Sequence, residues 1–367
     1  MEAFCAMITL LSLHILLVAC LVSVMCAIPG VFLVLRSVAM MSDAISHAIL
    51  PGIVLMFFWV GNLESPLLLV GAAIAGIATV LATELLMSTN QLKKDAAIGL
   101  VFPFFFSIGV ILISMYARTV HLDVDMVLLG ELIFAPFNRM VIAGYDVGSY
   151  ALWSTSILII GNLILTKLFF KEITLSIFDP QLALLAGFFP QLLYYGLMII
   201  TSITAVTAFN IVGSFVVVAL MIAPAATASL FTHSVKQMLI ASTGISLLAA
   251  INGYTAAYVS DVSITGSIAV CNGLLFVIAL LIAPHKGLMS RITNHYKNIK
   301  AKQYAVVLHY LSNQPWISSA IVAQHLGWSL KHIENTLVYL HNQKLIDTNH
   351  HVTQNGHHYL QKEMAGN

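Results

Sequence analysis

The chain has 367 residues, of which 59% are hydrophobic and only 8% are charged, and its mean hydropathy is +0.94. Soluble domains carry about 25% charged residues, so this composition excludes an ordinary water-soluble enzyme and indicates a membrane protein with many spans. The formal net charge of +1 combines two unlike parts. Residues 1–290 hold nine Lys/Arg and twelve Asp/Glu, whereas residues 291–367 hold seven Lys/Arg, three Asp/Glu and nine of the 14 histidines. We therefore expect a transmembrane domain at 1–290 and a separate cytoplasmic domain at 291–367.

A helix needs about 20 mostly apolar residues to cross a bilayer. The apolar runs of this chain are continuous rather than alternating, which predicts helices and not a β-barrel. We expect an all-α polytopic membrane protein with about nine transmembrane helices, two of which are divided only near Asn210. In chain order, the predicted helices cover residues 7–35, 44–60, 66–87, 98–116, 151–170, 192–209, 212–232, 238–259 and 264–283.

The positive charges lie mainly in alternate gaps between the predicted helices. Cytoplasmic loops of membrane proteins are rich in Lys and Arg, so the more basic set of gaps faces the cytoplasm. This rule puts the N-terminus outside and residues 291–367 inside. The cytoplasmic set holds Arg36, Lys93, Lys94, Lys167, Lys171, Lys236 and Lys286, and the outer set holds Arg118 and Arg139.

The outstanding polar pattern inside an apolar stretch is the segment 42–52, with the sequence SDAISHAILPG. Asp43 and His47 are four residues apart and share one face of a helix. A carboxylate oxygen and an imidazole nitrogen together suit a divalent transition metal such as Mn, Fe or Zn. Pro51 frees a backbone carbonyl one turn away and allows the helix to bend. The alternative is a hydrogen bond between Asp43 and His47 that only locks helix packing.

Two other groups of ionisable residues are candidates for a role in cation movement. His121, Asp123 and Asp125 lie on the outer side and can attract metal at the entry, or they form a solvated loop face. Glu84 lies late in the third predicted helix, either against a polar cavity or at the interface near Lys93. We favour the interface.

Motifs for nucleotide hydrolysis and hydrolytic chemistry are absent from the sequence. It contains no phosphate-binding loop of the G-x-x-x-x-G-K-[ST] type, no nucleophile elbow and no H-E-x-x-H zinc motif. We therefore expect a protein that is not itself an enzyme. Energy for uphill transport must come from a partner or from an ion gradient.

The segment after residue 290 has the composition of a soluble domain. Apolar residues recur at helical spacing in 302–313, 318–326 and 329–343. Residues 344–353 then read as two short strands around a polar turn, and a final helix covers 354–364. Three helices followed by a hairpin is the order of a winged-helix domain.

The segment 35–52, LRSVAMMSDAISHAILPG, resembles the second-helix signature of the zinc/manganese/iron ABC-transporter permeases, and most closely the manganese/iron-type branch. Three further segments resemble the family in the same order. They are 94–99 at the start of the fourth helix, 170–187 in a cytoplasmic segment and 216–228 in a late apolar motif. The resemblance covers roughly residues 13–284, with departures at Ala39, Ser42 and Glu131.

The resemblance implies a homodimeric permease in the bacterial cytoplasmic (inner) membrane, with an ABC ATPase on the cytoplasmic side and an extracytoplasmic metal-binding protein. It implies no permanently bound cofactor, Mn²⁺, Fe²⁺ or Zn²⁺ as the transported ion, and ATP bound to the partner subunit. Asp43 and His47 match the positions that contact the metal. The segment that docks on the ATPase includes Glu172, Phe178, Asp179, Pro180 and Gly187.

The part beyond residue 290 exceeds the usual family length and is similar to winged-helix transcription regulators. Its third predicted helix, 329–343, has Lys331 as its only full positive charge against Glu334, which is weak for binding DNA phosphates. A regulatory or protein-contact module is therefore favoured over a DNA-binding one. The alternative function is a membrane-anchored, metal-responsive regulator with a DNA-binding tail, and a gradient-driven carrier is a third reading.

Overall fold

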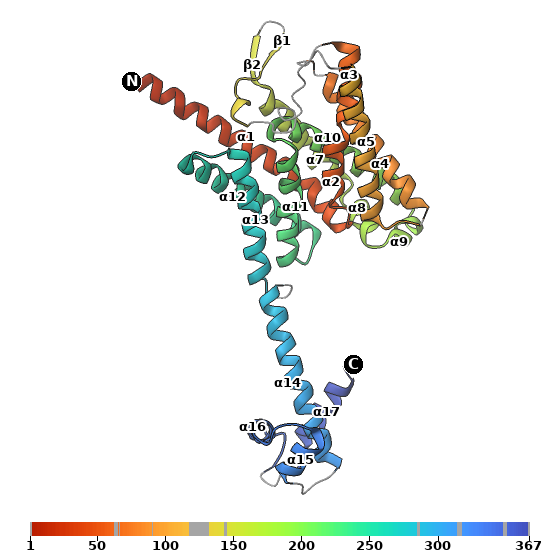
Figure 1. Ribbon diagram of the computed structural model, residues 1–367, viewed down its shortest axis with the longest axis vertical. Coiled ribbons are helices and arrows are strands. Elements are labelled where there is room, and N and C mark those ends of the chain that lie inside the picture. The colour runs from red at the N-terminus through yellow and green to blue at the C-terminus, as the bar shows by residue number, and fades with distance from the viewer. Residues whose placement is uncertain are drawn as a thin grey trace. The chain divides into compact units, whose positions relative to one another are not determined.

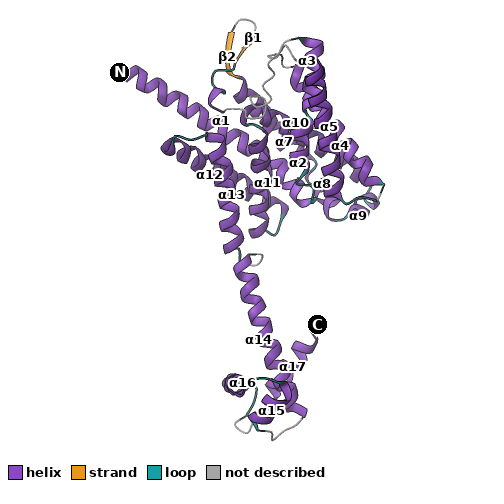
Figure 2. Ribbon diagram, in the orientation of Figure 1, coloured by secondary structure: helices purple, strands orange, loops and turns teal. Residues whose placement is uncertain are grey.

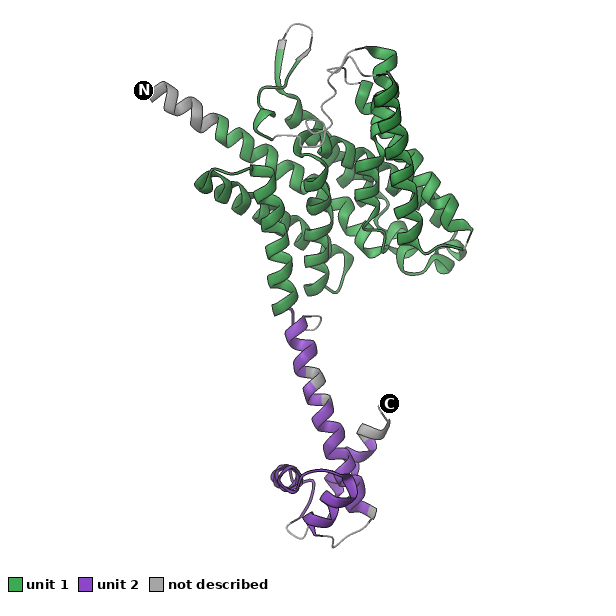
Figure 3. Cartoon of the chain, viewed as in Figure 1, with its two compact units in different colours: residues 1–281 green, residues 282–367 purple. Residues whose placement is uncertain are grey.

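Figure 1 shows the computed structural model of the chain, and Figure 2 shows that almost all of its regular structure is helical. The chain divides into two compact units, unit 1 (Met1–Leu281) and unit 2 (Ile282–Asn367), which Figure 3 distinguishes by colour. The domain boundary expected after residue 290 stays a prediction. The structure describes residues 2–61, 65, 67–89, 91–116, 132–142, 145–284, 287–313, 318–347 and 351–365.

Within these described residues, nine helical segments are long and apolar enough to cross a membrane, as the sequence predicted. The second of them consists of two helices that follow one another. The helices are α1 (Glu2–Leu35), α2 (Met41–Ala48) with α3 (Leu50–Val60), α4 (Leu67–Ser88), α5 (Lys94–Tyr116), α7 (Tyr150–Leu168), α10 (Pro190–Val212), α11 (Ser214–Phe231), α12 (Val235–Ser260) and α13 (Ile264–Ile282).

Three helix boundaries have clear local causes. Pro51 has no N–H to donate to the carbonyl of His47 four residues earlier, so α2 ends at Ala48 and α3 begins with the proline in its first turn. The helix α5 begins at Lys94 rather than at residue 98, and Asp95 stabilises its N-terminus. The break between α10 and α11 lies at Gly213 rather than at Asn210, because its φ of +83° is accessible to glycine.

The segment between α5 and α7 contains short elements in its described part. A turn of 3-10 helix, η1 (Leu132–Phe134), precedes an antiparallel hairpin of β1 (Arg139–Ile142) and β2 (Tyr145–Ser149). Arg139 Nε lies 3.0 Å from Asp146 Oδ2 across this hairpin. The ion pair is exposed, and the register of the hairpin shifts between Met140 and Val141.

Two short helices, α8 (Phe170–Phe178) and α9 (Pro180–Leu185), connect α7 to α10. They separate at Asp179, whose Oδ1 accepts a hydrogen bond of 2.9 Å from the backbone N–H of Leu182. Asp179 is therefore the N-cap of α9, with Pro180 at the first helical position, where its missing N–H costs nothing.

The helix α1 forms the centre of unit 1. It contacts α7, α10, α11 and α12, and every residue from 25 to 33 is buried, which covers all sides of the helix. A helix that is apolar all round is typical of such a central position. Ser246 of α12 donates a buried hydrogen bond of 2.8 Å to the carbonyl of Ser23, which also ties the two helices together.

Small residues permit close contact between α3 and α4. Gly52 and Gly71 face each other, so a methyl group on either would overlap the backbone carbonyl oxygen of the other. Small residues at such crossings allow helix backbones to approach closely in membrane proteins.

Unit 2 contains α14 (Leu288–Asn313), α15 (Ser319–Leu326), α16 (Leu330–Asn342) and α17 (Gln354–Ala365). The helix α14 begins at Leu288 and not at residue 302, where the sequence predicted its start. The residues between these two positions are mostly polar and show no apolar pattern, but they are helical as well. A small apolar core holds these helices together, and Tyr304 stacks on Tyr339 with ring centroids 4.4 Å apart. The buried core residues are Val307, Leu308, Leu311, Val322, Ala323, Ile333, Leu337, Leu340, Ile346 and Leu360.

Between α16 and α17, the described residues form one antiparallel bridge rather than the two strands that the sequence predicted. Ile346 pairs with Val352, and the N–H of Asp347 donates to the carbonyl of His351 at 2.8 Å. The N–H of Thr353 also donates to the carbonyl of Leu345 at 3.0 Å, so the described part of the pairing covers residues 345–347 and 351–353. The winged-helix assignment of unit 2 stays a prediction.

We expect Gly52→Ala to lower the thermal midpoint of the purified protein, measured by unfolding in detergent. The added methyl group forces α3 and α4 apart, and such overpacking costs about 1–3 kcal/mol. Gly244→Ala in α12 is the matched control, because nothing outside its own helix backbone lies within 4 Å of the new methyl group. Equal midpoints for the two variants would contradict this close packing.

Candidate metal site

The short helix α2 brings Asp43 and His47 together, as their spacing predicted. His47 Nε2 lies 3.4 Å from Asp43 Oδ1, and the two side chains are 23% and 33% exposed. A charge-assisted hydrogen bond is typically 2.7–2.9 Å long, so this contact is a loose one. The carboxylate and the imidazole therefore lie side by side on one face of α2 without a short hydrogen bond between them.

The other polar groups of this helix are already occupied. Ser46 Oγ donates a hydrogen bond of 2.9 Å to the carbonyl of Ser42, and Ser42 Oγ donates one of 3.1 Å to the carbonyl of Ala39. The carbonyl of His47 differs, because Pro51 cannot donate to it. The break between α2 and α3 thus leaves one backbone oxygen next to the imidazole side chain.

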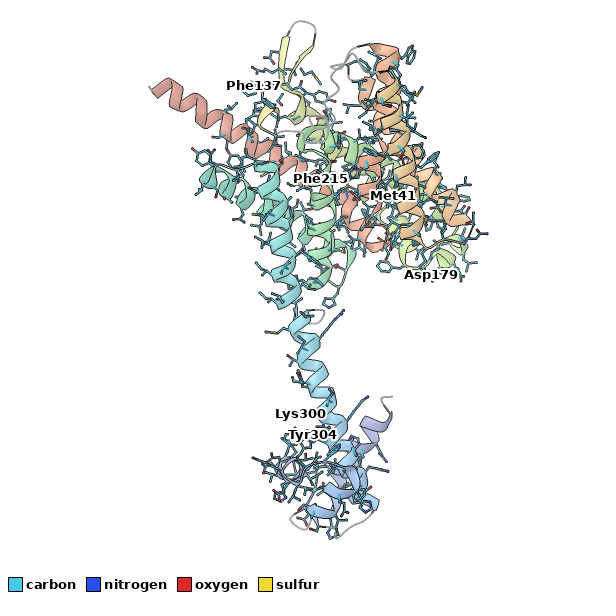
Figure 4. The ribbon with its side chains drawn as sticks, in the orientation of Figure 1. Met41, Phe137, Asp179, Phe215, Lys300 and Tyr304 are labelled. Atoms are coloured by element: carbon cyan, nitrogen blue, oxygen red, sulfur yellow. The ribbon has the colours of Figure 1, made fainter. Side chains whose placement is uncertain are left out.

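Aromatic side chains surround the imidazole of His47. Its ring centroid lies 6.0 Å from Phe102 and 6.3 Å from Phe106, both in α5, and 6.1 Å from Phe215 in α11. Figure 4 labels Phe215, and also Met41 at the start of α2. The imidazole therefore packs beside aromatic rings of two other helices, and 23% of its side chain is exposed. Phe102 and Phe106 are one turn apart in α5, but all three phenylalanines lie far from His47 in the sequence, and no sequence motif marked them.

A complete metal shell is not present among the described residues of one chain. They contain no group of three or more His, Cys, Asp or Glu side chains that could hold a metal ion. Asp43 and His47 therefore offer two donors, whereas zinc sites usually have four. His121, Asp123 and Asp125, the predicted entry residues, lie outside the described residues.

The predicted docking residues occupy one continuous segment. Phe178 at the end of α8 is 66% exposed, and Asp179 and Pro180 follow it at the start of α9. Gly187 lies between α9 and α10 with a φ of +84°. Glu172 differs from the others, because its Oε2 is buried and has no hydrogen-bond partner in the described part of the chain. Figure 4 labels Asp179.

A second polar cluster was not predicted from the sequence. Arg36, Glu84, Ser176 and Tyr194 line a cavity of about 370 Å³ together with Lys94. Glu84 lines this cavity, which was one of the two alternatives for it, and Lys94 lines the cavity as well. Burial lowers the pKa of the Arg36 guanidinium, and Tyr194 and Glu84 oppose that shift. The only sign of this cluster in the sequence was Arg36, a single charged residue at the end of the apolar run 7–35.

The fold and the site together define a class of protein. The described residues contain nine apolar spans, a broken second span with an acid and a histidine, and a short helical segment with exposed apolar side chains, and these features fit a membrane permease. Residues 9–283 match the ABC 3 transport family, and the chain belongs to this family.

Individual relatives agree with the family match. The chain is 41% identical to the zinc transport system membrane protein TroD of Treponema pallidum, over 88% of this chain and 89% of that protein. That aligned stretch is longer than unit 1, so it extends into unit 2. The chain is also 41% identical to the manganese transport system membrane protein MntD of Bacillus subtilis, over 74% of this chain and 92% of that protein.

A solved structure has the same fold. PsaBC from Streptococcus pneumoniae, in complex with Fab, superposes with a TM-score of 0.61 and 30% sequence identity. The match covers 74% of this chain and 91% of that one. The predicted family and the all-α membrane fold are thereby confirmed.

Proposed function

We propose that this chain is the membrane-spanning subunit of an ATP-driven importer that moves a divalent transition metal, Mn²⁺, Fe²⁺ or Zn²⁺, into the bacterial cytoplasm. The observation that supports this function is the loose contact between Asp43 and His47 on the broken second span of an ABC 3 family permease. The relatives named as zinc and manganese transport proteins point to the same class of substrate. The regulator alternative has no support from the family or from these relatives.

Asp43 and His47 are proposed to bind the ion in transit. One carboxylate and one imidazole hold a transition metal without completing its shell, which suits an ion that must leave again. Further donors would come from the carbonyl of His47 and from a second copy of the chain in a homodimer. Phe102, Phe106 and Phe215 would keep the imidazole in position while the ion passes.

One protein partner is proposed for each side of the membrane. An ABC ATPase, which binds and hydrolyses the ATP, is proposed to dock on α8 and α9, where Phe178 and Leu185 are exposed. An extracytoplasmic protein would deliver the metal on the opposite side, where His121, Asp123 and Asp125 would attract it. Membrane lipid would cover the exposed apolar side chains of the spans.

Contacts between loops support the proposed orientation. Lys94 Nζ donates to the carbonyl of Arg36 at 3.3 Å, and Lys236 Nζ lies 5.6 Å from the ring centroid of Phe170 in α8. The basic residues of these gaps therefore meet at one end of unit 1, as a shared cytoplasmic side requires. Unit 2 would then lie in the cytoplasm as a regulatory or protein-contact module.

We expect Asp43→Asn and His47→Gln each to reduce metal uptake at least about tenfold, because even the loss of a supporting residue costs 10- to 100-fold at a metal site. Uptake of radioactive Mn²⁺ or Zn²⁺ by cells or proteoliposomes measures this. Asp95→Asn, an exposed carboxylate in the first turn of α5, is the matched control and should transport normally. If both variants are present at normal protein levels and take up metal as the wild type does, Asp43 and His47 do not bind the ion in transit.

For the docking segment, we expect Asp179→Ala to weaken co-purification of the ATPase subunit. Alanine removes the acceptor for the N–H of Leu182, which costs about 0.5–2 kcal/mol at a helix N-cap and loosens α9. Asp179→Asn keeps an oxygen at the same place and should retain the ATPase. Undiminished co-purification with the alanine variant would mean that α9 is not the docking element.

A further inference from the structure

Arg36 joins three elements of unit 1 at the end of α1. Its Nη2 donates a hydrogen bond of 2.6 Å to Ser176 Oγ in α8, across 140 positions of sequence. Its Cζ lies 4.9 Å from the centroid of the Tyr194 ring in α10. A guanidinium that bonds a hydroxyl and covers an aromatic face is held in a defined direction.

The chain between Arg36 and the metal-site helix is short and closed by backbone hydrogen bonds. The N–H of Val38 donates to the carbonyl of Leu33, and the N–H of Met41 donates to that of Val38, both at 3.0 Å. Ser37 has a φ of +56°, which a non-glycine residue rarely adopts. Such a tight connection transmits a displacement of Arg36 to the first turn of α2 instead of absorbing it.

Charged groups around Arg36 hold it in the cluster. Glu84 in α4 attracts the guanidinium electrostatically, and Lys94 at the start of α5 donates to the backbone carbonyl of Arg36. Lys94 is the second positive charge lining the cavity, and Glu84 is the negative one. Residues of α4, α8 and α10 therefore act on the side chain of Arg36, and Lys94 of α5 binds its backbone.

The cluster has room for a second arrangement. Two of its buried atoms, Arg36 Nε and Glu84 Oε2, have no hydrogen-bond partner among the described residues. They lie around the cavity of about 370 Å³, so the guanidinium can exchange Ser176 for another acceptor without displacing a helix. Coupling between distant sites requires such an element with two discrete arrangements.

We propose that Arg36 is a positioning residue that passes movement of the segment α8–α9 to α2, and so to Asp43 and His47. This inference rests on the proposed function. When the ATPase moves α8, the bond from Ser176 pulls Arg36, and the closed connection turns the start of α2. ATP hydrolysis and metal release are thereby linked through one side chain.

The test is the ratio of metal transported to ATP hydrolysed, measured in the same proteoliposomes with the complete complex of permease, ATPase and binding protein. Arg36→Lys keeps the charge but loses the planar, multidentate geometry, and Ser176→Ala removes only the hydroxyl. We expect each to lower the ratio about fivefold or more while ATP hydrolysis and ATPase association continue, since couplings of this kind amount to 5- to 150-fold. Arg139→Lys, in the hairpin ion pair, is the matched control.

The double variant shows whether the two residues act through one bond. If they do, Arg36→Lys with Ser176→Ala lowers the ratio no further than the stronger single variant. If Arg36→Lys fails to accumulate, Ser176→Ala decides the matter alone. A wild-type complex that moves no metal would reject the proposed function, whereas wild-type transport with unchanged ratios in the variants would overturn this inference only.

Discussion

The hydrocarbon part of a membrane offers no water to hydrogen-bond backbone N–H and C=O groups, and this constraint governs unit 1. Each apolar span satisfies its backbone within its own helix, and most hydroxyls do the same. Thr79 and Thr83, for example, each donate to the carbonyl four residues earlier at 2.8 Å. At the break between α2 and α3, Pro51 has no N–H to donate to the carbonyl of His47, so the helical bond is missing there. Because α2 packs inside the protein, this break is tolerated at the depth where the proposed site lies.

Under the same constraint, the few ionisable side chains of unit 1 must lie at its ends or find partners. Two groups of them lie on α2 or just before it. Asp43 and His47 lie on the helix itself, whereas Arg36 lies at the start of the connection that leads to it. Asp43 and His47 are proposed to hold the transported ion, and Arg36 is proposed to pass movement of the segment α8–α9 to α2. Arg36 is only seven residues before Asp43, so a movement of one can reach the other through the short connection between them.

Much of the fold followed from local sequence. The apolar runs predicted the nine spans, a spacing of four residues put Asp43 and His47 on one helix face, and Pro51 predicted the bend after them. These features depend on neighbours within one or two turns, so periodicity and residue type are enough to predict them. The same local reasoning gave a start for α14 that was too late, because polar residues can extend a helix without leaving an apolar pattern.

Only the tertiary structure decided what surrounds those residues. Phe102, Phe106 and Phe215 enclose His47, and Ser176 receives the bond from Arg36, because helices distant in the chain pack side by side. A span that is apolar on every side gives no signal of which face meets which neighbour. The sequence by itself therefore determined the membrane class, the spans and the metal-binding candidate, whereas helix packing decided the environment of the site and its connection to the docking segment.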